Sequence, residues 1–182
     1  SALPADKNFV QVDAGKFHSL ALADDGQIFG WGANSRGQLG NGTTVDASIP
    51  SVATTPEGVS FVQVAGGEQH TIALAADGGV YAAGYNSSGQ LGTGDTASSS
   101  TFVPVAFGGV LLEGAKIVDI AAGESSFSLA LADTGVIYAW GANSNGQLGN
   151  GSTTNSLVPV AVTAPEGVAF ASFDAGRNWS IA

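Results

Sequence analysis

The same eleven-residue string occurs three times in this chain, and this repetition limits the possible folds more than any other feature. It reads GANSRGQLGNG at 32–42, GYNSSGQLGTG at 84–94 and GANSNGQLGNG at 141–151. A recurring string in a fixed order indicates serial units that bury their faces against one another. We therefore expect one domain, residues 1–182, built from repeats.

A second marker, an apolar residue followed by two small or acidic residues and glycine, sets the length of the unit. It ends at Gly15, Gly67, Gly123 and Gly176, so the steps are 52, 56 and 53 residues. The repeats are expected at about 9–60, 61–116 and 117–169, with a partial unit at 170–182.

Apolar residues alternate within each unit, as in FVQVA at 61–65 and TIALA at 71–75, which is typical of short half-buried strands. ADDG, AADG and ADTG, beginning at Ala23, Ala75 and Ala132, join the two middle strands. Asp and Gly both tolerate the positive φ of a tight hairpin, so these segments are expected to be hairpin turns.

A fourth strand is expected around Pro50, Pro104 and Pro159, at the edge of each sheet because proline cannot donate to a central ladder. Four strands in about fifty residues fit a β-propeller blade. The expected fold is thus all-β, a β-propeller of four-stranded blades, with about three blades and the start of a fourth.

The repeated string itself is interpreted as scaffold. Its glycines can take turn conformations, its asparagine can close an Asx-type turn on its own backbone, its glutamine can bond backbone groups, and Leu39 can anchor the loop on the blade. A ring of ligand-binding amides is the alternative. The expected structural turn residues are Gly32, Asn34, Gly37, Gln38, Gly40, Gly84, Asn86, Gly89, Gln90, Gly92, Gly141, Asn143, Gly146, Gln147 and Gly149.

Composition argues against several functions. The net charge of −10 disfavours nucleic acid and anionic lipid as partners, and no apolar run approaches the length of a membrane span. The absence of cysteine removes disulfides and thiolate chemistry. The acidic balance and the Ser/Thr/Asn-rich loops favour an extracellular or cell-surface protein of a bacterium.

Chemical motifs are also few. The acidic residues Asp24, Asp25, Asp77 and Asp133 stand at expected turns, and neither a G-x-S-x-G elbow nor a P-loop occurs. The stretches 40–46 and 92–100 offer oxygen ligands for Ca²⁺, but acidic residues are too sparse there to favour a site. We expect no enzyme activity, no metal and no cofactor.

The string VAGGEQHTIAL at 64–74, followed by YAAGYNSSGQLGTG, resembles the repeat of the regulator of chromosome condensation family. The resemblance covers nearly the whole chain and implies a β-propeller, usually of seven blades. The sequence departs from the pattern at Asp13, at Phe127, which takes the histidine position after an extra residue, and at Trp179. His18 and His70 are interpreted as packing residues near the propeller axis and not as metal ligands.

The chain ends inside an expected strand at Ala182. It is therefore expected either to be a piece of a larger propeller or to complete a ring or stack by pairing open blade edges between copies.

The repeats differ most directly after each small-Gly marker, in the connection between two strands. Aromatic and arginine side chains there are types that anchor interfaces, although Phe17 and Trp179 could instead pack beneath the loops. Among the proteins that this sequence resembles, the propeller inhibitors of β-lactamase use similar loops to bind another protein. The expected partner-binding residues are Lys16, Phe17, Glu68, Gln69, Glu124, Ser125, Ser126, Arg177, Asn178 and Trp179.

The leading hypothesis is a non-enzymatic propeller module that binds a protein partner or self-associates, as part of a larger secreted or surface protein. The alternatives are a regulator that catalyses guanine-nucleotide exchange, as the resemblance implies for the founding member, and a propeller enzyme acting on glycans. Fold alone does not separate them.

Overall fold

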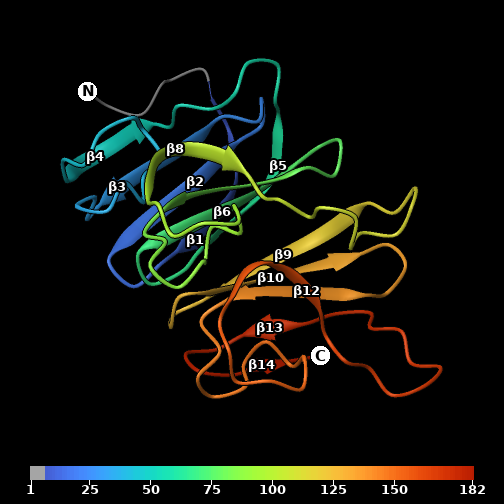
Figure 1. Cartoon of the computed structure of the whole chain (residues 1–182). Coiled ribbons are helices and arrows are strands. Elements are labelled where there is room, and N and C mark those ends of the chain that lie inside the picture. Colours follow the sequence, from blue (N-terminus) through green and yellow to red (C-terminus); the bar gives the residue numbers. More distant parts are fainter. Residues whose placement is uncertain (1–6) are drawn as a thin grey trace.

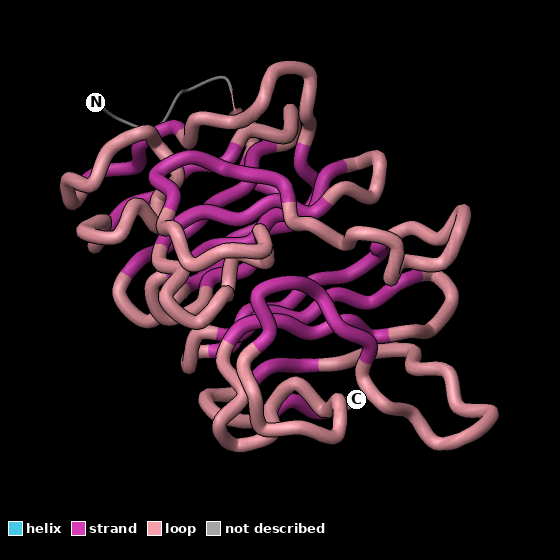
Figure 2. Tube along the Cα trace, in the orientation of Figure 1, coloured by secondary structure: helices cyan, strands magenta, loops and turns pink. Residues whose placement is uncertain are grey.

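The computed structural model describes residues 7–182, and in that range the regular elements are all β-strands, with no helix that could cross a membrane (Figure 2). Three four-stranded antiparallel sheets are followed by a two-stranded one, and each sheet takes its strands in sequence order. This is the architecture of propeller blades, so the expected all-β propeller of three blades and the start of a fourth is confirmed. The blades contain β1 (Phe9–Ala14), β2 (His18–Ala23), β3 (Ile28–Gly32) and β4 (Ala47–Val52); β5 (Phe61–Gly66), β6 (His70–Ala75), β7 (Val80–Gly84) and β8 (Ser99–Pro104); β9 (Ile117–Gly123), β10 (Phe127–Ala132), β11 (Ile137–Gly141) and β12 (Ser156–Ala161); and β13 (Asp174–Ala175) with β14 (Ser180–Ile181).

The blades are arranged around a common axis. The first strands of successive blades contact one another, β1 with β5, β5 with β9 and β9 with β13. The strands β4, β8 and β12 form the opposite edge of each sheet. Figure 1 follows the blades from blue β1 to red β14. The first strand of each blade is therefore the inner one.

Each outer strand contains one of the three prolines that the sequence assigns to a blade edge. Pro50 lies in β4, Pro104 in β8 and Pro159 in β12. Proline has no N–H to give to a neighbouring strand, and an outer strand has a neighbouring strand of its sheet on one side only. The expected edge position is confirmed.

The turn between the second and third strands of a blade is tight, as expected, but glycine alone supplies its positive φ. Gly26 has a φ of 82°, and its N–H donates to the carbonyl of Ala23 at 3.0 Å. Among residues 7–182, Ser126 is the one residue other than glycine with a positive φ. The expected hairpin turns are confirmed, and the left-handed position in each falls on the residue without a Cβ.

The hydrophobic core lies between the blades. Leu20 and Leu22 of the first blade pack with Phe61 and Val64 of the second. A second cluster joins the second blade to the third in the same way. Full burial of such a side chain contributes about 1.5–3 kcal/mol, which an isolated blade would lose. Each repeat is therefore stabilised by packing against the repeats next to it.

The third blade has one extra residue before its second strand. Phe127 pairs with Gly123 and Gly141, as His18 pairs with Gly32 in the first blade. The extra residue, Ser126, takes a φ of 60°. Phe127 thus occupies the histidine position, as the sequence indicates.

Candidate interaction surface

Two kinds of loop meet on one face of the blades, which we call the loop face. The first is the short turn after each inner strand, at 15–17, 67–69, 124–126 and 176–179. The second is the long loop between third and outer strands, at 33–46, 85–98 and 142–155. The two are joined by backbone hydrogen bonds, as from the N–H of Ala33 to the carbonyl of Phe17 at 2.9 Å. The same bond joins Tyr85 to Gln69 and Ala142 to Ser126.

The structure brings sequence-predicted residues together in two pairs from adjoining blades. Nζ of Lys16 lies 2.6 Å from Oε1 of Glu68. Oγ of Ser125 donates to Oδ1 of Asn178 at 2.5 Å. In the described part of the chain, no hydrogen bond or ion pair between side chains joins these two pairs, so they form two separate groups of side chains on the loop face.

Both aromatic side chains among the predicted residues are exposed. Phe17 is 53% exposed, and the ammonium of Lys16 lies 5.0 Å from its ring centroid. Trp179 is 55% exposed, although its ring lies against Gly176, where a Cβ would come within 2.3 Å of it. Phe17 therefore presents an apolar surface to solvent. The ring of Trp179 packs against Gly176 but is also exposed to solvent.

The sequence reasoning missed a cation–aromatic pair on the same face. The guanidinium of Arg36 lies 4.5 Å from the ring centroid of Tyr85, in the loop of the next blade. A signal was present, because Arg36 corresponds to Ser88 and Tyr85 to Ala33, and these are two of the three positions that vary in the repeated string. The pair is a second cation–aromatic contact on the loop face.

The leucine of each repeated string anchors the loop beneath this face, as expected. Leu39, Leu91 and Leu148 are fully buried. Oε1 of Gln38 accepts the N–H of Arg36 at 3.0 Å, which agrees with the backbone role assigned to the glutamine. The string also clamps the next blade, since the N–H of Gly42 donates to the carbonyl of Ser100 at 2.8 Å.

The asparagine of the string does more than close a local turn, so the Asx-turn expectation is corrected. Oδ1 of Asn34 accepts the N–H of Leu39, five residues ahead, at 2.9 Å. Its Nδ2 donates to the carbonyls of Thr43 and Val45, both at 3.1 Å. Asn34 is fully buried, so the side chain holds the whole loop from inside. Asn86 and Asn143 make the corresponding bonds.

The same geometry bears on the oxygen-rich stretches considered for Ca²⁺. Nδ2 of Asn86 donates to Oγ1 of Thr93 and to the carbonyls of Asp95 and Ala97. An amide nitrogen thus occupies the position among the oxygens that a cation would need. Within residues 7–182, no group of three or more His, Asp or Glu side chains could hold a metal ion.

The two histidines lie between blades. Nε2 of His18 is 2.9 Å from Oγ1 of Thr71, which donates its proton to the carbonyl of Gln38 at 2.7 Å. Because the hydroxyl proton is used, Nε2 carries the imidazole proton and donates. Burial lowers the pKa of His18 to about 4. Burial, and then the charge of His18, lower the pKa of His70 to about 3, so both rings are neutral at pH 7.

An open cavity of about 320 Å³ follows the inner strands. Side-chain amides cross it: Nε2 of Gln11 donates to the carbonyl of Val64 at 3.0 Å, and its Oε1 accepts the N–H of Val64 at 2.9 Å. Gln63 makes the same two bonds with Ile120. Oδ2 of Asp13 accepts the N–H of Gly66 at 2.8 Å. Gln11, Gln63 and Asp13, which line this cavity, therefore join one blade to the next.

Comparison with known proteins agrees with the blade architecture and loop pattern. The sequence profile described as "Regulator of chromosome condensation (RCC1) repeat" matches residues 25–74, 77–131 and 134–182. A second profile of the same description matches residues 9–38, 61–90 and 117–147. These matches define a β-propeller repeat protein. The chain belongs to the RCC1 repeat family, whose members form protein-interaction modules.

Several relatives are much longer than this chain. The Ultraviolet-B receptor UVR8 of Arabidopsis thaliana is 36% identical over 172 residues, which are 94% of this chain and 38% of the receptor. The human probable E3 ubiquitin-protein ligase HERC3 is 42% identical over 97% of this chain, but only 16% of the ligase is matched. The chain therefore spans well under half of either protein.

Solved structures show the same fold. Prp20p of Saccharomyces cerevisiae, described with its binding properties to Gsp1p and histones, superposes with a TM-score of 0.80 at 22% identity, covering 94% of this chain and 42% of Prp20p. Human WBSCR16 gives a TM-score of 0.60 at 25% identity, over 97% of this chain and 57% of WBSCR16.

Proposed function

We propose that this chain is a non-enzymatic binding module whose loop face takes a protein partner. The observation that carries the proposal is the exposed Phe17 with the Lys16 ammonium beside its ring and Glu68 of the next blade beside that ammonium. An apolar ring with charges at its rim is the usual composition of a protein-binding surface. The binding of Gsp1p and histones by the similar Prp20p supports the choice of a protein partner.

A catalytic role is not proposed. Oδ1 of Asp77 accepts the N–H of Gly79 at 2.9 Å within a turn, and Asp13 bonds to the neighbouring inner strand. These carboxylates have backbone partners that account for their positions. As part of the same proposal, the module belongs to a secreted or surface protein of a bacterium, supported by its acidic balance and polar loops; cell fractionation tests this placement.

The test is site-specific cross-linking followed by a binding measurement. A photoreactive phenylalanine analogue replaces Phe17, and the same analogue at Val158, on an outer strand, is the matched control. We expect a discrete cross-linked protein from Phe17 alone. The purified partner should then bind Phe17→Ser and Lys16→Gln more weakly, by about fivefold to thirtyfold for a contact of 1–2 kcal/mol. Unchanged binding by both variants would contradict the proposal.

Self-association is a second candidate function, and the candidate surface for it is the apolar side of the first blade. Val12 is 72% exposed beside a cavity of about 500 Å³ that is lined by Val12, Asp13, Ala14, Ser19, Leu20 and Trp31. The corresponding residues of the second blade, Val64 and Thr71, are buried against the first. Light scattering over a range of concentrations tests this, and Val12→Glu should abolish any assembly that uses this side.

A further inference from the structure

The face opposite the loop face carries features that the proposed function does not use. It contains the turns at 24–26, 76–78 and 133–135 and the connections between blades at 53–60, 105–116 and 162–173. Backbone hydrogen bonds join turn to connection, as from Ala76 to Ser60 and from Phe170 to Gly135, both at 2.9 Å. We call this surface the turn face.

Irregular pairing of the inner strands exposes apolar side chains on the turn face. The register of β1 shifts between Phe9 and Gln11, so Val10 has no partner opposite and is 63% exposed. Val62 has the same place in β5, and Val118 lies between two paired residues of β9 where the register again shifts. A β-bulge re-aims a side chain in this way. Other exposed apolar residues at this end of the blades are Val52, Val110, Leu112 and Val168.

A small hollow lies where the first connection meets the second blade. Its volume is about 140 Å³, and its lining is mostly apolar, with a single carboxylate at Asp77. Ala76 is tied to the connection by its N–H, which donates to the carbonyl of Ser60 at 2.9 Å. The hollow therefore fits one extended side chain. The lining residues are Gly58, Val59, Ser60, Ala75, Ala76 and Asp77.

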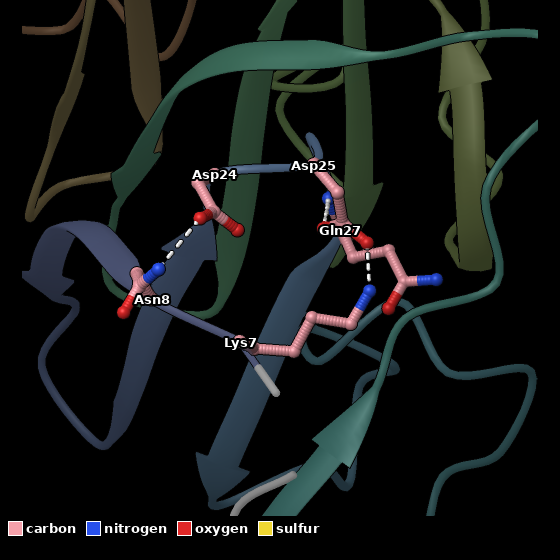
Figure 3. A network of polar contacts seen from close by, with 5 residues as sticks. All are labelled: Lys7, Asn8, Asp24, Asp25 and Gln27. Atoms are coloured by element: carbon pink, nitrogen blue, oxygen red, sulfur yellow. Dashed lines mark hydrogen bonds and ion pairs between the residues drawn. The ribbon is translucent and has the colours of Figure 1, made fainter. Parts of the chain in front are cut away.

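The charge around this apolar surface is strongly negative. Lys7 pairs with Asp25 and lowers the pKa of that carboxyl (Figure 3). The side-chain amide of the neighbouring Asn8 donates to Asp24 at 2.9 Å. Three other cations, Lys16, Arg36 and Arg177, belong to the loop face. In the described part of the chain, the turn face carries Asp24, Asp25, Glu57, Asp77, Glu113, Asp133 and Glu166 against Lys7 and Lys116.

We propose that the turn face is a second docking surface, for a basic and partly apolar segment of another protein. A lysine of that segment places its methylene stem in the hollow and its ammonium beside the carboxylate of Asp77. Apolar side chains of the segment cover Val62 and the neighbouring valines. The seven carboxylates attract a cationic segment and repel anionic ones. Exposed apolar surface rimmed by charge is characteristic of such sites.

The test uses a fluorescein-labelled synthetic peptide of alternating lysine and leucine, with fluorescence anisotropy as the readout. Two matched peptides replace lysine by glutamate or leucine by serine. We expect the lysine–leucine peptide to bind, more weakly as salt rises. Asp77→Asn, which keeps the acceptor for the N–H of Gly79, should weaken binding about threefold to fivefold. Ala76→Phe, which fills the hollow, should weaken it further, and Glu124→Gln on the loop face is the control for charge alone.

Three results would overturn the proposal: equal binding of the lysine–serine peptide, equal weakening by Glu124→Gln and Asp77→Asn, or unchanged binding by Ala76→Phe. Each variant is checked for an unaltered melting temperature, and Val62→Ser replaces any variant that fails this check, with the same expected weakening. Phe17→Ser should leave peptide binding unchanged. This result separates the turn face from the loop face, because either surface can fail its test without the other.

Discussion

The hydroxyl of Ser128 lies 3.0 Å from Nε2 of His70, and it joins two blades. It donates to the carbonyl of Gln90 at 2.9 Å and accepts the imidazole proton of His70. His18 and Thr71 repeat the arrangement one blade earlier. In the next interface Phe127 replaces the histidine, and the hydroxyl of Ser180 still donates to the carbonyl of Gln147 at 2.9 Å. The bond from hydroxyl to carbonyl is thus the same in all three interfaces between blades. The ring that accompanies it is a histidine in two of them and a phenylalanine in the third.

The first prediction concerns acid stability. The pKa values of His18 and His70 are lowered to about 4 and about 3 by burial, so the folded rings stay neutral while unfolded histidine binds protons near pH 6.5. The unfolded state therefore gains protons first, and the free energy of unfolding should fall as the pH decreases from about 6.5. Each histidine contributes a slope of about 1.4 kcal/mol per pH unit until its folded pKa is reached. Urea unfolding at pH 7.5, 5.5 and 4.5 measures this.

The control is His70→Phe, which places at this position the side chain that the third blade carries at Phe127. Between pH 6.5 and 4.5, the free energy of unfolding of this variant should depend on pH less steeply, by the slope of one histidine. At pH 7.5 the variant should be about 1 kcal/mol less stable, because the hydrogen bond to Ser128 is lost. An unchanged slope in this variant would mean that other groups cause the acid sensitivity.

The second prediction concerns the buried amide of Asn86. Asn86→Ala should cost about 1–3 kcal/mol, because the carbonyls of Asp95 and Ala97 and the N–H of Leu91 lose their partner. Asn86→Asp keeps the acceptor for Leu91 but turns a carboxylate towards those carbonyls, so it should cost more than alanine. Thermal melts at pH 7.5 compare the two. A smaller loss for the aspartate variant would contradict the donor role assigned to Nδ2.

The sequence predicted the blades because their signals are local. Alternation, the glycine of each turn and a proline such as Pro104 each report on one strand or one turn. The position of Phe127 could also be read, since an insertion shifts the repeat visibly. The hydrogen bonds of Asn34 with Leu39 and Val45 could not be predicted, because the spacing of residues in a loop does not say which groups meet when the loop folds back. The contact of Arg36 with Tyr85 was missed for a similar reason, as it joins two repeats.

The third prediction concerns the leucine anchor. Leu91 is fully buried in the cluster between the second and third blades, so Leu91→Ala should cost about 2–5 kcal/mol through the lost burial and the cavity left behind. Val45, in the long loop of the first blade, is 71% exposed. Val45→Ala should therefore change stability by less than about 0.5 kcal/mol. Urea unfolding of both variants tests the difference. Similar losses would mean that the loop is not anchored through its leucine.

The last prediction separates backbone strain from contact between blades. Gly89 and Gly146 occupy the same position of the repeated string, with φ values of 85° and 76°. A Cβ on Gly89 would come within 2.7 Å of the Cα of Leu157 in β12, whereas a Cβ on Gly146 would meet nothing closer than 4.0 Å. Gly146→Ala should therefore cost only about 1–2 kcal/mol, the cost of the left-handed conformation. Gly89→Ala should cost clearly more, because the third blade must move away from the second. Urea unfolding of the two variants measures the difference, and equal losses would show that the loop of the second blade does not press against β12.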